Sequence, residues 1–396
     1  MIENVFLMDN TIQDYEWGSK EAIGYLFGLS NPNNKPMAEI WMGAHPKASS
    51  AIMVEGQQLS LNAYINAHKE EVVGRQTYQR FGELPYLFKV LSAGKALSIQ
   101  AHPSKSQAEA GFARENEQGI PVAAAHRQYK DSNHKPEIIY ALTPFLAMNG
   151  FRAHHDILNL LSALQSPLLD VPLQSFASAQ DGRGLRQLFE TVLSFDGEPK
   201  QALLASLISW AHREQSPLAQ LVIMLSGQYP GDIGLLAPLM LNVVELEPGE
   251  AMFLDAGTPH AYIQGTGLEV MANSDNVLRA GLTPKHIDVG ELLACCRFEA
   301  LQDDKLLIQP QQQGVETLYP VPVDDFCFSI LDKPDGHLID CESCEIWFAI
   351  DDNVAFSDSS GGELIILKGQ SVFVSAKGKG VLVTSEGKVA RVSSPL

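Results

Sequence analysis

The chain has 396 residues and a mass of 43.2 kDa, which is too long for one ordinary domain and predicts two or three. With 45% hydrophobic and 19% charged residues, its composition is typical of a globular protein with sizeable cores. The formal net charge of −19 disfavours nucleic acids and membrane surfaces as partners, because both polyanions would be repelled. A small phosphorylated substrate is not excluded, since a few buried cations can create a local positive pocket.

Cysteine usage and hydropathy indicate the cellular compartment in which the protein is expected. The five cysteines are an odd number, so they predict no disulfide framework and favour a reducing compartment. The N-terminal sequence MIENVFLMDN carries acids where a signal peptide needs a basic start. The most apolar run near the middle, residues 235–244, contains Pro238 and is far too short to span a membrane. We therefore expect a soluble, cytoplasmic protein.

Short apolar segments bounded by Gly, Pro and polar residues fill the first 150 residues, and this pattern predicts β-strands. Residues 105–130, rich in Ala, Glu and Gln, are expected to form a helical or looped excursion. The predicted strands cover residues 38–42, 84–91, 96–100, 138–142 and 144–148.

After residue 152 the apolar period changes to that of a helix. Similar apolar faces recur within residues 157–164, 185–193 and 203–211. The turn-rich sequences DGRG at 181–184 and DGEP at 196–199 are interpreted as helix stops. The sequence therefore predicts a helical insert over residues 152–231.

The strand pattern resumes after Pro230 and continues through a second β region from about residue 311 to the end. Many short strands with regular turns are typical of a sandwich or a barrel. The strands predicted here cover residues 240–246, 251–254, 268–271, 326–331, 346–350, 364–367 and 370–374.

Four polar side chains near predicted strands form a candidate metal-ligand set. Gln100 and His102 lie two apart on one strand, so their side chains point to the same face. His260 follows a strand and a tight turn, and Glu137 lies between the two segments in sequence. One amide, one carboxylate and two imidazoles suit zinc with an open coordination position. Taken alone, each histidine would more often be structural, and Glu137 would more often be a surface carboxylate.

The sequence spacing around these residues favours a metal site over those structural interpretations. Residues 94–102 read Gly-x5-Gln-x-His and residues 249–260 read Gly-x5-Asp-x-Gly-x2-His, which resemble the two cupin motifs. Gln100 replaces the usual first His, Asp255 replaces the usual Pro, and Glu137 is displaced by an insertion. These departures disfavour a cupin dioxygenase, the rival enzyme class, because it would need a histidine-rich iron site.

Longer motifs follow one another along the chain. They are YEWGS at 15–19, AEIWMGAHPKASS at 38–50, LPYLFKVLSAGKALSIQAHPSK at 84–105, HKPEIIYALTPFLAMNGFR at 134–152, GTPHAY at 257–262 and LEVMANSDNVLRAGLTPKHID at 268–288. In this order they resemble the type I phosphomannose isomerase family over essentially the whole chain. The resemblance implies a zinc enzyme, with one ion per chain, that interconverts mannose 6-phosphate and fructose 6-phosphate. The zinc ligands and the catalytic arginine that it implies are Gln100, His102, Glu137, His260 and Arg279.

With this resemblance, the strand pattern predicts a mainly β, double-cupin fold of two jelly-roll barrels with an α-helical insert domain. We expect a metal-binding catalytic cupin domain at 1–151 and 232–310, the insert at 152–231, and a C-terminal cupin-like domain at 311–396. Residues 368–375 resemble half of the downstream motif but end without a histidine, so no metal is expected there. Cys341 and Cys344 lack a correctly spaced second pair, so a structural zinc is not expected either. We expect a monomer.

The implied reaction moves a proton between C1 and C2 of the sugar through an enediol, so negative charge develops on oxygen. Zinc could polarise or orient the substrate oxygens. Arg279, a permanent cation, could stabilise the enediolate or hold the phosphate, although alone it would as often be a surface residue. A sugar-phosphate-binding or regulatory cupin, the non-enzyme alternative, could keep the cations and lose some ligands, whereas all four candidate ligands are present.

The general base should titrate near neutrality and face C1 and C2 from one side. Lys135 and Arg279 are favoured as catalytic residues, with Glu269 third. Each lysine could instead be a solvated surface residue. The residues expected to contact the phosphate or hydroxyl groups, or to line the pocket, are Lys89, Lys285 and His45.

Overall fold

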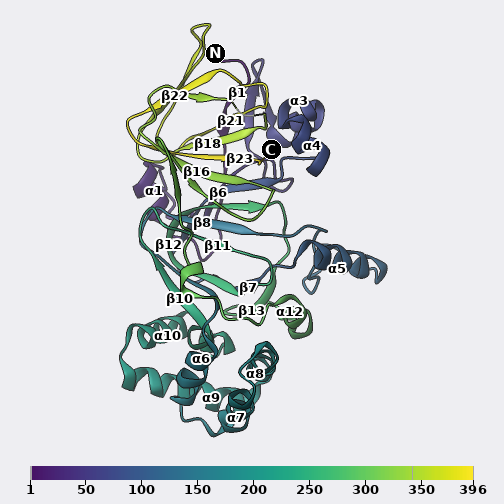
Figure 1. Cartoon of the computed structure of the whole chain (residues 1–396), viewed down its shortest axis with the longest axis vertical. Coiled ribbons are helices and arrows are strands. Elements are labelled where there is room, and N and C mark those ends of the chain that lie inside the picture. The colour runs from purple at the N-terminus through teal and green to yellow at the C-terminus, as the bar shows by residue number, and fades with distance from the viewer. Residues whose placement is uncertain (1, 341, 396) are drawn as a thin grey trace.

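The computed structural model describes residues 2–340 and 342–395, so Cys341 of the Cys341–Cys344 pair lies outside the described residues. The strands occupy most of the length of the molecule and the helices between β9 and β10 gather at one end (Figure 1). The strand-rich architecture with a helical insertion confirms the predicted mainly β fold class.

A ten-stranded sheet forms the middle of the molecule, with the order β10-β9-β12-β6-β3-β2 and with β7, β8, β11 and β13 paired beside this path. The long strand β12 pairs with β6, β7, β8 and β9, so one strand organises both halves of the sheet. The strands are β2 (Thr11–Gln13), β3 (Glu39–Met42), β6 (Tyr86–Ala93), β7 (Ile99–Ala101), β8 (Glu137–Ala141), β9 (Phe145–Phe151), β10 (Leu241–Leu246), β11 (Ala251–Leu254), β12 (His260–Ala272) and β13 (Leu278–Gly281).

A nine-stranded sheet combines C-terminal and N-terminal strands in the order β14-β15-β16-β23-β18-β21-β1-β4-β5. Val5 of β1 pairs with Val374 of β21, so the start of the chain completes the C-terminal sheet. A four-stranded sheet, β17-β22-β19-β20, accompanies it. These strands are β1 (Val5–Asp9), β4 (Ala51–Val54), β5 (Gln57–Ser60), β14 (Gln311–Gln313), β15 (Glu316–Tyr319), β16 (Cys327–Asp332), β17 (His337–Ile339), β18 (Glu345–Ala349), β19 (Val354–Ser357), β20 (Glu363–Ile366), β21 (Ser371–Val374), β22 (Val381–Ser385) and β23 (Lys388–Ser393).

The inserted helices pack against the sheet through one continuous apolar core. Ile99 of β7, Met148 of β9 and Leu278 of β13 belong to the same buried cluster as the helical leucines. Apolar faces with helical period explain this packing, since each helix buries one stripe. The segments are α6 (His154–Ser162), η1 (Pro167–Leu169), α7 (Asp170–Ser178), α8 (Gly182–Ser194), α9 (Gly197–Glu214), α10 (Pro217–Gln228), η2 (Ile233–Leu236) and α11 (Ala237–Met240).

Short helices connect the strands elsewhere. The predicted excursion at 105–130 contains α5, which begins with a capping box in which Ser104 and Gln107 satisfy each other's backbone N–H groups. No helix in the described part of the chain has the length and hydropathy that crossing a membrane requires. The helices are α1 (Ala22–Phe27), α2 (Leu61–His68), α3 (Glu70–Val73), α4 (Arg75–Phe81), α5 (Lys105–Glu117), α12 (Val289–Cys295) and η3 (Asp303–Lys305).

Candidate metal centre and its cavity

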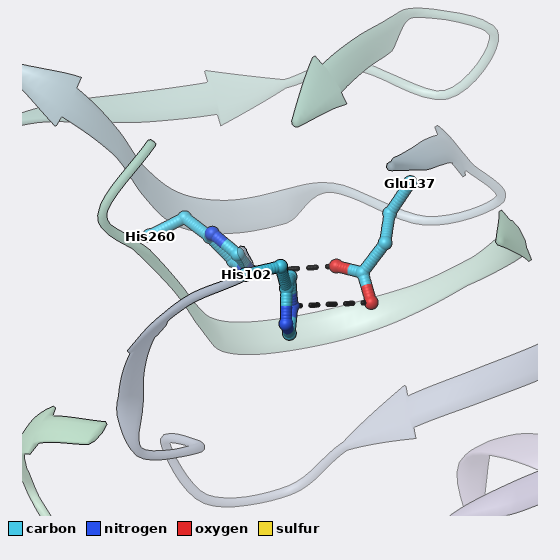
Figure 2. Close-up of side chains that lie close together, drawn as sticks. All are labelled: His102, Glu137 and His260. Carbon is cyan, nitrogen blue, oxygen red and sulfur yellow. Dashed lines mark ion pairs between the residues drawn. The ribbon is translucent and has the colours of Figure 1, made fainter. Parts of the chain in front are cut away.

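Three strands bring His102, Glu137 and His260 to one point. Glu137 and His260 open β8 and β12, and His102 directly follows β7. The Nε2 atom of His102 lies 3.5 Å from Glu137 Oε1, and the Nε2 atom of His260 lies 3.3 Å from Glu137 Oε2. Figure 2 shows the two imidazoles side by side facing the carboxylate, and their ligand atoms all lie within 4.8 Å of one another. This spacing can accommodate one metal ion.

The three side chains are buried, and the atoms that face the centre lack partners. His102 and Glu137 are 1% exposed and His260 is 0% exposed. Within the described residues, both Nε2 atoms and Glu137 Oε2 have no hydrogen-bond partner. Buried polar atoms without partners are costly, and these two nitrogens and one oxygen are the donor types that zinc prefers. The residues present therefore fit a zinc ion.

The protonation states also suit a metal. Burial lowers the pKa of His102 to about 4, so its imidazole is neutral at pH 7. Burial alone would raise the pKa of Glu137, but Lys135 and His102 outweigh it and hold that pKa well below its usual value. A neutral imidazole and an ionised carboxylate are the forms that bind metals.

Gln100, the fourth predicted ligand, lies on β7 directly opposite His260 of β12. Paired residues on neighbouring strands project to the same face of a sheet, so Gln100 and His260 share a face. Arg279 of β13 pairs with Gln100 on its other side. Arg279, Gln100 and His260 thus form one row across three strands.

A cavity of about 1100 Å³ opens beside this row. Six of the residues singled out from the sequence line it, which are His45, Lys89, Gln100, Lys135, Arg279 and Lys285. Glu269 contacts one of these lining residues, Lys89, whose Nζ lies 2.7 Å from Glu269 Oε2. Lys135 contacts the metal group directly, with its Nζ 3.0 Å from Glu137 Oε1.

Lys89 lies in a buried network of charges. Its ammonium is 3.5 Å from Glu39 Oε1, and the Glu39 carboxylate accepts a 2.7 Å hydrogen bond from the Trp41 indole. Burial alone would lower the pKa of Lys89, but Glu269 and Glu39 outweigh it and hold the pKa above its usual value. Burial raises the pKa of Glu269, which Lys89 opposes. Lys89 therefore stays cationic, and burial favours the protonated form of Glu269.

Arg279 and Lys285 also line the cavity and have no carboxylate at ion-pair distance among the described residues. Burial lowers the pKa of Arg279, and burial together with Arg279 lowers the pKa of Lys285. Two cations that lack a protein counterion form a site that favours an anion.

His45 is buried beside Trp41, with the two ring centroids 4.9 Å apart. Its Nδ1 accepts a 3.3 Å hydrogen bond from the backbone N–H of Lys47, and its Nε2 lies 3.7 Å from Asp275 Oδ1. Burial lowers the pKa of His45, so the neutral ring presents an N–H toward Asp275.

The sequence interpretation missed several residues at the site, including Glu39, Trp41 and Asn276. Glu39 and Trp41 alternate along one short strand with apolar residues, and this period of two could have placed both on one face. Asn276 lies in a polar loop and carried no comparable signal, because its partners are more than 140 residues away.

Two family models match this chain. "Phosphomannose isomerase type I, catalytic domain" matches residues 5–154. "Phosphomannose isomerase type I, helical insertion domain" matches residues 167–241, the part of the chain that contains α7 to α10.

Curated relatives and solved structures agree with these matches. Mannose-6-phosphate isomerase of Escherichia coli K12 is 48% identical over 389 residues, covering 98% of this chain and 99% of the relative. The same enzyme from Rattus norvegicus is 34% identical and covers 94% and 93%. A mutant phosphomannose isomerase from Salmonella typhimurium superposes with a TM-score of 0.96 at 46% identity, covering 99% of this chain and 100% of that structure. A zinc-bound mannose 6-phosphate isomerase gives 0.95 at 46% identity, with the same coverage.

Proposed function

The chain belongs to the type I phosphomannose isomerase family, and on this premise we propose how its cavity carries out zinc-dependent interconversion of D-mannose 6-phosphate and D-fructose 6-phosphate. The observation that carries the proposal is the group of His102, Glu137 and His260, buried and with unpartnered ligand atoms, beside a cavity lined by cations.

Gln100, His102, Glu137 and His260 would hold the zinc ion. Three of them supply the buried ligand atoms, and Gln100 shares a face with His260 in the adjacent strand. Bound zinc supplies a Lewis acid that polarises or orients the substrate oxygens. Lys135, 3.0 Å from Glu137, adds a second positive charge beside that carboxylate.

Arg279 and Lys285 would hold the anionic parts of the substrate. A phosphate dianion needs cations in a protein of net charge −19, and within the described part of the chain these two have no carboxylate at ion-pair distance. Arg279 is the nearer of the two to the metal group along the sheet, because it pairs with Gln100. We assign it to the developing enediolate or to the phosphate, with its planar fork able to contact two oxygens at once.

Proton transfer between C1 and C2 needs a group that can both take up and return a proton. Glu269 is suited to this role because burial raises its pKa toward neutrality. Lys135 remains the alternative, because its Nζ lies beside Glu137 at the cavity wall. Lys89 is held between two carboxylates and would bind a substrate oxygen as a fixed cation, and His45 would donate its Nε2 proton to a hydroxyl.

Isomerisation in D₂O tests this proton transfer. Purified protein with mannose 6-phosphate should yield fructose 6-phosphate that carries deuterium at C1, seen by ¹H NMR, because an exchangeable side chain moves the proton. A Glu269→Gln protein that retains zinc should lose most of the turnover. Full turnover of a zinc-loaded Glu269→Gln protein would exclude Glu269 as the base, and product that requires O₂ would instead support the dioxygenase alternative. Binding of the sugar phosphate without any turnover would support a regulatory cupin.

We also propose the domain division 1–151 with 232–310, 152–231 and 311–396, a monomeric protein and a cytoplasmic location. Support for the location comes from the odd number of five cysteines, which favours a reducing compartment. Sedimentation velocity should give a single species near the chain mass of 43.2 kDa. A species of twice that mass would contradict the monomer.

A further inference from the structure

The outer nitrogen of His102 faces a backbone carbonyl. Its Nδ1 lies 2.7 Å from the carbonyl oxygen of Asn276. A carbonyl can only accept, so Nδ1 carries the proton and Nε2 keeps its lone pair toward Glu137 and His260. The orientation of the ring therefore depends on where the backbone of residue 276 is held.

The side chain of Asn276 holds that backbone in place. It is 0% exposed, and it forms hydrogen bonds with the segment of residues 130–133. Its Oδ1 accepts from the backbone N–H of Lys130 at 2.7 Å and of Asp131 at 3.3 Å. Its Nδ2 donates to the backbone carbonyls of Asp131 and Asn133, both at 2.9 Å, and to Asp131 Oδ1 at 3.2 Å.

The segment that Asn276 holds leads directly into β8. Asn133 is four residues before Glu137, and Lys135 lies between them. Asp131 braces the same junction from its own side, since its Oδ1 accepts from Ser274 Oγ at 2.8 Å and its Oδ2 accepts from the backbone N–H of Asp275 at 2.7 Å. One buried amide thus connects the segment before Glu137 to the carbonyl that orients His102.

We propose that Asn276 is a positioning residue that fixes His102 and Glu137 relative to each other for zinc binding. The proposal rests on the proposed function only in taking these two residues as zinc ligands. Removing the amide would leave the backbone groups of residues 130–133 without their buried partners, and the two segments would separate or rearrange. Hydrogen-bonded partners of metal ligands raise affinity by fixing ring orientation and tautomer.

The zinc affinity of Asn276→Ala tests this proposal without substrate. Competition with a chromophoric chelator at pH 7.5 should show zinc binding about 10–100-fold weaker than in the unmodified protein. Asn273→Ala is the matched control, because Asn273 lies in the same loop. Its Nδ2 donates a 2.5 Å hydrogen bond to the carbonyl of Leu84 rather than to residues 130–133. The control should bind zinc with affinity within about threefold of the unmodified protein. Cobalt(II) in place of zinc should show an altered visible spectrum in Asn276→Ala only.

Equal zinc affinity in folded Asn276→Ala and in the unmodified protein would overturn the proposal and leave Asn276 a purely structural residue, even if its melting temperature fell. Because zinc is measured alone, this outcome differs from failure of the proposed function, in which the unmodified protein binds zinc and does not isomerise the sugar.

A second measurement needs no substitution and covers the case in which Asn276→Ala does not fold. Long-range ¹H–¹⁵N spectra of the metal-free protein at pH 8 report which ring nitrogen of His102 carries the proton. The contact with Asn276 predicts Nδ1–H and an unprotonated Nε2. Protonation at Nε2 would overturn the proposal, because Nδ1 could not then donate to the carbonyl.

Discussion

Single cations in the cavity differ in what they contact, and this difference separates their roles. Lys89 lies 2.7 Å from Glu269 and is fixed in a buried network. Lys47 lies 2.6 Å from Asp275 at the more exposed edge. Arg279 and Lys285 have neither kind of partner among the residues described. A bound anion would neutralise this second pair, so we expect substitutions there to act on substrate binding or turnover rather than on the fold.

Arg279→Lys keeps the charge and removes the planar fork. We expect turnover to fall by about 10²–10³, the usual cost of losing one preorganised electrostatic contact. Zinc content, measured by mass spectrometry of the metal, should not change, because Arg279 is not among the proposed zinc ligands. Arg183→Lys, at an exposed position on α8, is the control and should keep normal kinetics. A raised KM at normal turnover would assign Arg279 to ground-state phosphate binding, and unchanged constants would contradict both roles.

The metal-free protein should lose stability in mild acid because of His102. Burial lowers the pKa of His102 to about 4, against an ordinary value of 6.5. Above pH 6.5 the ring is neutral in both states, whereas between pH 6.5 and 4 only the unfolded chain takes up the proton. The free energy of unfolding should therefore fall with pH across this window, by up to about 3 kcal/mol at its lower end. Urea unfolding at several pH values measures the loss, which should be smaller in His102→Asn. An identical slope in both proteins would contradict the burial of this ring.

Gln100, His102 and His260 were accessible from the sequence as candidate ligands because their spacing resembles the cupin motifs. Gln100 and His102 are two positions apart on a predicted strand, which places their side chains on one face. A glycine-bearing turn precedes His260. Glu39 and Asn276 were not accessible in this way. Glu39 meets Lys89 across 50 residues and Asn276 meets Lys130 across 146, and such contacts arise only from the fold.

Among the secondary-structure elements, periodicity predicted the helices well and the strand ends less well. α8 buries Leu185, Leu188, Phe189 and Val192, which are four of the apolar residues on the predicted helical face. The DGRG sequence begins this helix rather than only ending the previous one, because Asp181 accepts hydrogen bonds from the N–H groups of residues 183 and 184.

The strand predicted at 96–100 is shorter in the structure, where β7 starts at Ile99. Ala96 instead turns toward the inserted helices, since its N–H donates to Gln228 Oε1 at 2.9 Å and its carbonyl accepts from the Tyr229 hydroxyl at 2.5 Å. Both partners lie more than 130 residues away, so local propensity could not reveal them. The contact also ties the insertion to the segment that leads into Gln100.

Asp232 fixes the turn that follows β13, between Arg279 and Lys285. Its carboxylate accepts from the backbone N–H groups of Leu282 at 2.8 Å and Thr283 at 3.1 Å, and Leu282 has a left-handed φ of 52°. Asp232→Ala should raise KM about tenfold and lower the free energy of unfolding by about 2 kcal/mol, because hydrogen bonds to a charged acceptor are lost.

Steady-state kinetics and urea unfolding measure both effects of Asp232→Ala. Asp170→Ala is the control, since Asp170 is exposed in the first turn of α7. A loss of stability with unchanged KM would show that the turn does not position the two cations.

Over the whole molecule, the net charge is negative, whereas the cavity is lined by several positively charged side chains. The net charge is −19, yet the cavity wall carries Lys and Arg side chains from several distant segments of the chain. At physiological ionic strength the screening length is about 8 Å, so an approaching anion responds to the nearby cations more than to the distant acids.

Salt should therefore slow substrate capture. We expect kcat/KM for mannose 6-phosphate to fall several-fold between low ionic strength and about 0.5 M KCl, mainly through KM, because screening weakens the local attraction. Initial rates over a salt series at constant pH give the dependence. An increase of kcat/KM with salt would mean that the net negative charge dominates capture.

Removal and return of zinc is the decisive test of the proposed metal centre. Protein treated with a chelator and shown to be metal-free should have lost its isomerase activity in a coupled assay for fructose 6-phosphate. One equivalent of zinc should restore activity and raise the melting temperature, because binding to the folded state stabilises it. With one equivalent of zinc, His260→Ala should recover neither activity nor the higher melting temperature, because one buried ligand is missing. Full activity of the metal-free protein, or full recovery of His260→Ala with one equivalent, would contradict a zinc site formed by His102, Glu137 and His260.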